Sequence, residues 1–305
     1  MEQNNKASEK EEIKVVYRGT YQDLPENKTV IIPEGIEEIA QSTFEGFQYL
    51  ERVVLPRSMK LISALAFAEC KNLKSVEMNV GLSEIGDEAF SSCTSLITVD
   101  MPDTVSRIGE GAFEGCANLA RVRLSESVYM IGAGAFAYCF NLTDLVIPDS
   151  CVMIEFRAFA SCFSLEGVKL SDSMTFLDES LFEGCRSLKV VDMPRALVRI
   201  GRRAFKDCAS LPSIILPVGV TSIGFDAFAG CTSLSRIAIP KGVREIEDDD
   251  IFGACDSLAE VSYGGGREDW ELLNHGKTLT IERSDLTMHT PRVIFLDIKD
   301  NPPKA

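Results

Sequence analysis

The sequence predicts an α/β solenoid, in which similar strand-turn-helix units stack on one another. Three observations support this prediction. A Phe recurs in steps of 23 residues, with one final step of 24. A Leu stands six positions after each of these Phe residues, and a fixed period in this range is the signature of stacked repeats. The apolar content of 45% is sufficient for a continuous core. The recurring residues are Phe44, Phe67, Phe90, Phe113, Phe136, Phe159, Phe182, Phe205, Phe228 and Phe252.

Each unit is expected to contain a short β-strand after the recurring Leu. An apolar residue follows three positions later, and another follows two positions after that, as Val122 and Leu124 follow Leu119. Alternation with a period of two indicates a strand with one buried face. Pro often comes next, as Pro148 does, and it ends the strand because it lacks an N–H group.

A turn and a short helix are expected to complete the unit. Ile or Leu follows the turn and is commonly succeeded by Gly, as in Ile108-Gly109, and Gly permits a sharp bend. The A-F-x-x-C segment places Phe113 and Cys116 three positions apart, which predicts one face of a short helix. We therefore expect a parallel sheet covered by helices, with neighbouring units stabilising each other in series.

Four regions are expected along the chain. The period fails after Tyr263, and a solenoid needs a cap because its last apolar face would otherwise be exposed. Trp270 is interpreted as a plug over that face, with a ligand platform as the alternative. The regions are a disordered acidic tail at residues 1–12, an N-terminal cap at 13–28, the repeat array at 29–263 and a C-terminal cap at 264–305.

The overall charge restricts the classes of partner. The chain has a formal net charge of −15 and a sequence pI near 4.7. Binding to nucleic acid or to an anionic membrane surface requires a basic face. The composition therefore predicts no nucleic-acid partner and no membrane partner, and it is compatible with a protein partner.

The start of the chain bears on its location. The first residues are polar, and the apolar run at 13–17 is too short for the hydrophobic part of a signal peptide. The sequence as written is therefore expected to be cytoplasmic. A cell-surface or secreted location is the alternative if a signal peptide has been removed.

The cysteines and histidines are the candidates for chemistry. Nine cysteines recur with the repeat and Cys151 lies off that pattern. Metal binding and a disulfide zipper are possible readings, but no CxxC pair or nearby His accompanies the cysteines, so buried apolar thiols are favoured. Neither His275 nor His289 is placed beside a nucleophile by the sequence. We therefore expect no enzymatic activity, cofactor, metal or small-molecule substrate. The recurring cysteines are Cys70, Cys93, Cys116, Cys139, Cys162, Cys185, Cys208, Cys231 and Cys255.

The repeat resembles a known family. Its pattern is L-x-x-V-x-I-P-x-x-V-x-x-I-G-x-x-A-F-x-x-C, found in ten consecutive copies from about Ile31 to Tyr263. This pattern is similar to the BspA-like class of bacterial leucine-rich repeats. The resemblance implies a curved leucine-rich-repeat array of about ten repeats, with caps at both ends. It also implies adhesion or protein binding at the surface of a host-associated microbe.

The strand face that varies between repeats is the predicted partner-binding surface. Two rows of outward residues flank the buried centre of each strand, and together they hold five acids and five bases. A mixed apolar and charged face, with Arg121, Arg123 and Val146 close together, suits a protein surface. The alternative is an ordinary solvated sheet face. The predicted binding residues are Arg52, Glu77, Asp100, Arg121, Arg123, Asp144, Val146, Lys169, Asp192, Ile215 and Arg236.

Four acids occupy the same position after successive strands and form a predicted acidic rim. Such a rim would attract a basic partner or Ca²⁺. The alternative is a turn role, because side chains of this kind bond to nearby backbone in turns, and this alternative is favoured. The four acids are Asp103, Glu126, Asp149 and Asp172.

The preferred function is a non-enzymatic scaffold that binds a protein partner on its strand face. Two alternatives stay open at this point. One is a cell-surface adhesin or host-interaction module that lacks its signal peptide. The other is an inhibitor or immunity protein that covers a basic enzyme, which requires a salt-sensitive complex.

Overall fold

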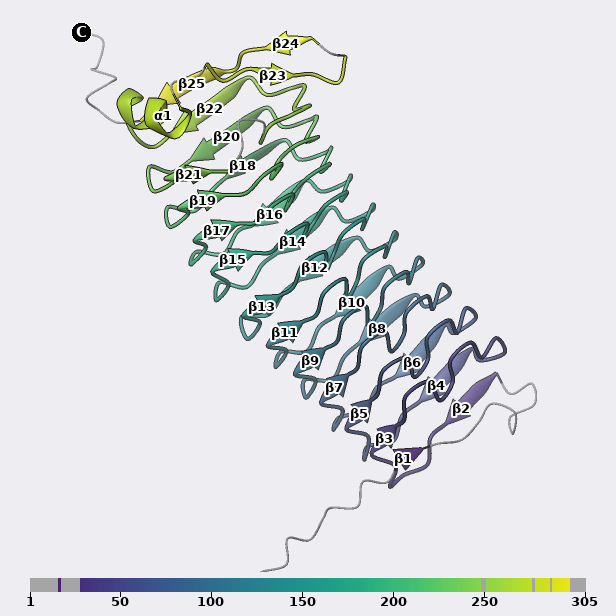
Figure 1. Ribbon diagram of the computed structural model, residues 1–305. Coiled ribbons are helices and arrows are strands. Elements are labelled where there is room, and N and C mark those ends of the chain that lie inside the picture. Colours follow the sequence, from purple (N-terminus) through teal and green to yellow (C-terminus); the bar gives the residue numbers. More distant parts are fainter. Residues whose placement is uncertain (1–15, 18–27, 248–250, 276–277, 286, 297–305) are drawn as a thin grey trace, which may run out of the picture.

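The computed structural model describes residues 16–17, 28–247, 251–275, 278–285 and 287–296. The predicted tail at residues 1–12 lies outside these ranges. The chain winds into coils that stack in one elongated column, which shows little curvature in the view of Figure 1. Strands pair in parallel with the equivalent strands of neighbouring coils, as Arg52 pairs with Ser75 23 residues later.

One strand of each coil has three or four residues, and these strands form the long-strand ladder. Its members are β2 (Thr29–Ile31), β4 (Arg52–Val54), β6 (Ser75–Glu77), β8 (Thr98–Asp100), β10 (Arg121–Arg123), β12 (Asp144–Val146), β14 (Gly167–Lys169), β16 (Val190–Asp192), β18 (Ser213–Ile215), β20 (Arg236–Ile239) and β22 (Glu260–Tyr263).

The other strand of each coil has two residues, and these strands form the short-strand ladder. Its members are β1 (Val16–Tyr17), β3 (Glu38–Ile39), β5 (Leu61–Ile62), β7 (Glu84–Ile85), β9 (Arg107–Ile108), β11 (Met130–Ile131), β13 (Met153–Ile154), β15 (Phe176–Leu177), β17 (Arg199–Ile200), β19 (Ser222–Ile223) and β21 (Glu245–Ile246).

The core runs the length of the column between the two ladders. The recurring Phe, Leu and Cys rows are buried, together with the central residues of most long strands. The ten Phe rings form one continuous stack with centroid separations of 5.1 to 6.1 Å. Stacked aromatic pairs contribute about 0.5–1.5 kcal/mol beyond the area that they bury. The period seen in the sequence is therefore the period of this core.

The prediction of a short helix in each repeat is wrong. Within the described residues the repeats contain no helix, and the A-F-x-x-C segment forms turns. The residues two before and two after Phe159 are Arg157 and Ser161, with φ of 57° and 59°, and such left-handed residues interrupt an α-helix. The Phe159 N–H donates to the carbonyl of Leu181 in the next coil at 3.1 Å. The Phe and Cys spacing therefore marks a tight corner whose hydrogen bonds run between coils.

The cysteines are buried, free thiols. In the recurring column, each Sγ donates to the carbonyl of the Phe one repeat before its own, as Cys116 does to Phe90 at 3.2 Å. Burial raises the pKa of the Cys116 thiol to about 12. The expectation of inert, buried thiols agrees with this geometry, because a thiol is nucleophilic only when ionised.

The chain changes pattern after β22. Helix α1 (Arg267–Leu273) follows it, and Trp270 on this helix is buried against Tyr263 with ring centroids 5.3 Å apart. Strands β23 (Ile281–Glu282) and β24 (Met288–His289) pair antiparallel, and β25 (Arg292–Phe295) pairs in parallel with β22. The long-strand ladder thus gains a strand from outside the repeat, and Trp270 lies where the plug interpretation requires it.

Candidate partner-binding face

The long-strand ladder presents one continuous outer face. Outward residues alternate with buried ones along each strand, as exposed Asp144 and Val146 flank buried Leu145. All eleven predicted binding residues are exposed on this face. Two apolar members are among the most exposed large side chains, with Val146 at 61% and Ile215 at 76%.

Some of the charges on this face are paired within the chain. Arg52 forms an ion pair with Glu77 one coil away. Arg123 forms an ion pair with Asp103 of the acidic rim at 3.0 Å. This hydrogen bond from Arg123 holds the pKa of Asp103 below its ordinary value.

The acidic rim has a structural role between coils. The Asp149 carboxylate accepts a hydrogen bond from the backbone N–H of Asp172 at 3.2 Å, and Asp172 accepts one from Arg195 at 3.1 Å. Asp103 accepts one from Glu126 at 3.4 Å. In the described part of the chain, no group of three or more His, Cys, Asp or Glu residues is arranged to hold a metal ion. These contacts reach the backbone of the next coil, whereas the turn interpretation expected bonds to backbone within the same turn.

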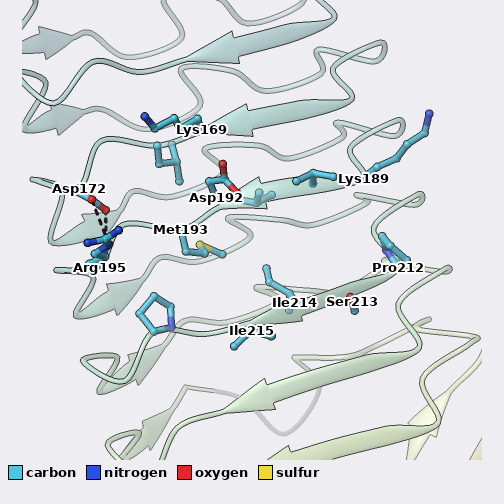
Figure 2. Close-up of a pocket in the computed structure, with 14 residues that line it drawn as sticks. Lys169, Asp172, Lys189, Asp192, Met193, Arg195, Pro212, Ser213, Ile214 and Ile215 are labelled. Atoms are coloured by element: carbon cyan, nitrogen blue, oxygen red, sulfur yellow. Dashed lines mark hydrogen bonds and ion pairs between the residues drawn. The ribbon is translucent and has the colours of Figure 1, made fainter.

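The long-strand ladder is split at three places. Pairing is absent between β6 and β8, between β10 and β12, and between β16 and β18. The strands at the third split are separated most widely. A hollow of about 410 Å³ lies over the second split and includes Arg121, Arg123 and Val146. A larger hollow, of about 700 Å³, lies over the third split (Figure 2).

Pro212 contributes to the third split, whereas Ile97 and Thr143 stand at the equivalent position of the first two splits. Pro212 stands just before β18. Most other coils have at this position a residue whose backbone N–H donates to a backbone carbonyl of the preceding coil. Lys189 donates to the carbonyl of Glu166 at 2.8 Å, and Glu166 donates to that of Thr143 at 2.7 Å. Pro has no N–H to donate. Sequence reasoning placed Val190 in an outward row but not among the predicted binding residues, and it missed Pro212 and Met193 as part of this face. The sequence already contained the signal, because a proline at the start of a predicted strand cannot donate a backbone hydrogen bond to the neighbouring strand.

A second apolar surface lies on the short-strand ladder and was also missed. Tyr129, Val152, Met153 and Phe156 are between 42% and 52% exposed, and Met130 pairs in register with Met153. The single interruption of this ladder, between β13 and β15, lies beside them. The sequence signal was the run of Met130, Met153 and Phe176 at the first position of three successive short strands, where most other coils carry a charged or polar residue.

The repeating coil with two parallel ladders defines a β-solenoid of about ten turns. The family described as the BspA type leucine rich repeat region (6 copies) matches residues 14–141 and 129–259. These matches cover most of the chain, and the protein belongs to this family. The resemblance that the repeat pattern indicated is therefore confirmed.

Several solved structures are similar to the chain. A leucine rich cell surface protein from Faecalibacterium prausnitzii A2-165 is 25% identical, with a TM-score of 0.44 over 85% of this chain and 92% of that chain. A leucine-rich repeat protein from Bacteroides ovatus ATCC 8483 is 25% identical, with a TM-score of 0.47 over 92% and 87%. The T. pallidum leucine rich repeat protein is 27% identical, with a TM-score of 0.46 over 69% and 79%. No curated protein matches the chain.

Among the described residues, no helix combines the length and apolar character needed to cross a membrane.

Proposed function

We propose that the protein is a non-enzymatic scaffold that binds a partner protein on its long-strand face. The observation that carries the proposal is a contrast between rows. The Phe, Leu and Cys rows repeat and are buried, whereas the outward rows of the long strands do not repeat and are exposed. Packing fixes the inner rows, so the outer rows are free to be selected for a partner.

The chemistry of this face suits a protein surface of mixed character. Its two outward rows contain five acids and five bases, although the chain carries a net charge of −15. Exposed Val146 and Ile215 supply apolar contact area. We expect binding to depend on apolar contacts at the centre of the interface, with charge pairs around them contributing little net affinity. The complex is then only weakly sensitive to salt, in contrast to a complex with a basic enzyme.

A comparison of bait variants tests this proposal. The bait is the full chain, compared with the Arg121→Ala, Arg123→Ala, Val146→Ala triple variant, and partners captured from native lysate are identified by mass spectrometry. A matched control replaces three residues on the turn side of the column, Glu69, Lys71 and Thr94, by Ala.

The expected result is one protein captured by wild type and by the control but lost by the triple variant. A purified complex of the two proteins then gives the affinity at low and high salt. Capture unchanged in the triple variant contradicts the proposed face. A complex that dissociates steeply with salt supports the inhibitor alternative instead.

A further inference from the structure

We infer that the split between β16 and β18 is a preformed slot that takes an aliphatic or aromatic side chain from an extended segment of the partner protein. The inference rests on the proposed function, since it names the point on the long-strand face that receives the partner. Pro212 keeps the slot open.

The slot exposes backbone groups that are hydrogen-bonded where adjacent long strands pair. Leu170 N–H donates to the carbonyl of Asp192 at 3.1 Å, and Leu216 N–H donates to that of Ala238 at 3.0 Å. Met193 occupies the same position between them. Among the described residues, no backbone hydrogen bond joins β16 to β18, and Met193 N–H has no backbone acceptor. An extended segment is suited to this edge because its own N–H and C=O groups match those of a strand.

The floor of the slot is apolar. Val191 and Met193 are half-buried, whereas Val168 and Leu170 at the same positions one coil earlier are only 3% and 2% exposed. Val190, Pro212 and Ile215 form its walls, and Figure 2 shows Ile214, Ile215 and Met193 around the opening. Buried apolar contact is the dominant source of affinity at the centre of an interface.

The slot is open on one side only. On the other side of the column the short strands β17 and β19 remain paired, with Ile200 opposite Ile223. The coils are therefore held together behind the slot. The hollow has a volume of about 700 Å³, which leaves room for a large apolar side chain.

The charges around the slot specify an uncharged occupant. Lys189 pairs with Glu166 at 2.9 Å, and Arg195 pairs with Asp172 at 3.5 Å. Lys169 is the register neighbour of Asp192, so their opposite charges are adjacent. The three bases and three acids therefore cancel. A charged side chain would lose part of its hydration in the slot, which is costly, and the balanced charges around the slot favour neither sign.

The first experiment asks whether Pro212 holds the slot open. Pro212→Ala and Pro212→Lys restore an N–H before β18, and Pro148→Ser is the matched control, because Pro148 follows its strand. Hydrogen exchange followed by mass spectrometry is expected to show new protection of the segments around Met193 and Ser213 in both Pro212 variants, and none in the control. Exchange that is unchanged in both Pro212 variants overturns the role of Pro212.

The second experiment asks what the slot binds. The probe is the capped peptide acetyl-Thr-Val-Phe-Val-Thr-amide, and a peptide with Asp in place of Phe is its control. The readout is the ε-¹³C methyl resonance of Met193 in methionine-labelled protein, assigned with Met193→Leu. Met78, which is half-buried beside the first split, serves as the internal reference.

The apolar probe is expected to shift Met193 and not Met78, and its affinity is expected to fall about tenfold in Pro212→Ala, equivalent to ~1.4 kcal/mol. A probe that leaves Met193 unshifted, or that binds equally to Pro212→Ala, overturns the slot. A partner protein lost by the Arg121/Arg123/Val146 variant but retained by Pro212→Ala would leave the proposed function standing and reject the slot alone. The reverse result would support the slot and place the binding site at its end of the long-strand face, whereas a partner retained by both variants would reject the proposed function and the slot together.

Discussion

The two ladders are built from the same 23-residue unit but differ in continuity. The short-strand ladder pairs without interruption from β1 to β13 and again from β15 to β21, whereas the long-strand ladder is split three times. Both ladders enclose the same Phe stack, so the core does not cause the difference. At the third split, Pro212 at the strand end removes a backbone N–H, and the inward residues Val191 and Met193 are half-buried there.

This comparison indicates a division of roles. The short strands and the Phe stack keep the coils at a fixed spacing. The long strands are then free to separate locally, because the ladder behind them holds. In this arrangement, single substitutions in the outer rows reshape the exposed surface of the long-strand ladder while the coils stay stacked.

The largest expected effect comes from the core that both ladders share. Phe136→Ala removes a ring stacked at 5.2 Å on Phe113 and 5.4 Å on Phe159, and it is expected to lower the free energy of unfolding by about 3–5 kcal/mol. Urea denaturation measures the loss. Phe140→Ala is the control, because Phe140 is 37% exposed and its loss is expected to be smaller. A loss below about 1 kcal/mol for Phe136→Ala would mean that the stack is not the main stabilising element.

A smaller effect on stability is expected from replacing glycine by alanine, because the space around the glycines differs between the two ladders. A Cβ at Gly132, just after β11, would lie 2.6 Å from the Glu110 backbone nitrogen. Gly132→Ala is therefore expected to force the coils apart and to destabilise the protein by about 1–3 kcal/mol.

The matched control for this prediction lies on the long-strand ladder. A Cβ at Gly167 in β14 would meet only the Asp144 carboxylate, at 3.6 Å. Gly167→Ala is expected to be neutral or slightly stabilising, by up to about 1 kcal/mol. Thermal unfolding of both variants measures the difference, and equal destabilisation would contradict the tighter spacing of the short-strand side.

The smallest expected effect concerns an exposed carboxylate beside β4. Hydrogen bonds from Lys28 and Lys74 lower the pKa of Glu51 from 4.5 to about 2. Because the folded-state pKa is depressed, the contribution of Glu51 to stability is present above pH 4.5 and is lost as the pH falls toward 2. NMR titration of the Glu51 carboxyl carbon checks the pKa. Lys28→Ala with Lys74→Ala is expected to return the pKa toward 4.5, and an unchanged pKa would exclude the two lysines as its cause.

Much of the architecture follows from the sequence alone. The 23-residue period, the buried Leu, Phe and Cys rows and the alternating strand residues predicted the stacked coils, because identical packing demands recur wherever identical coils touch. The same reasoning placed the eleven candidate residues outward, since a side chain between two buried strand residues must point away from the core.

The tertiary structure decided what the local pattern left ambiguous. A three-residue spacing of Phe and Cys is compatible with a helix or with a tight corner, and hydrogen bonds between coils selected the corner, with left-handed residues such as Arg157 and Ser161 on either side. The splits in the long-strand ladder likewise depend on whether each backbone N–H finds a carbonyl acceptor in the neighbouring coil. The sequence therefore determined the coil and its inward rows, whereas the position and shape of the slot arose only when the coils were stacked.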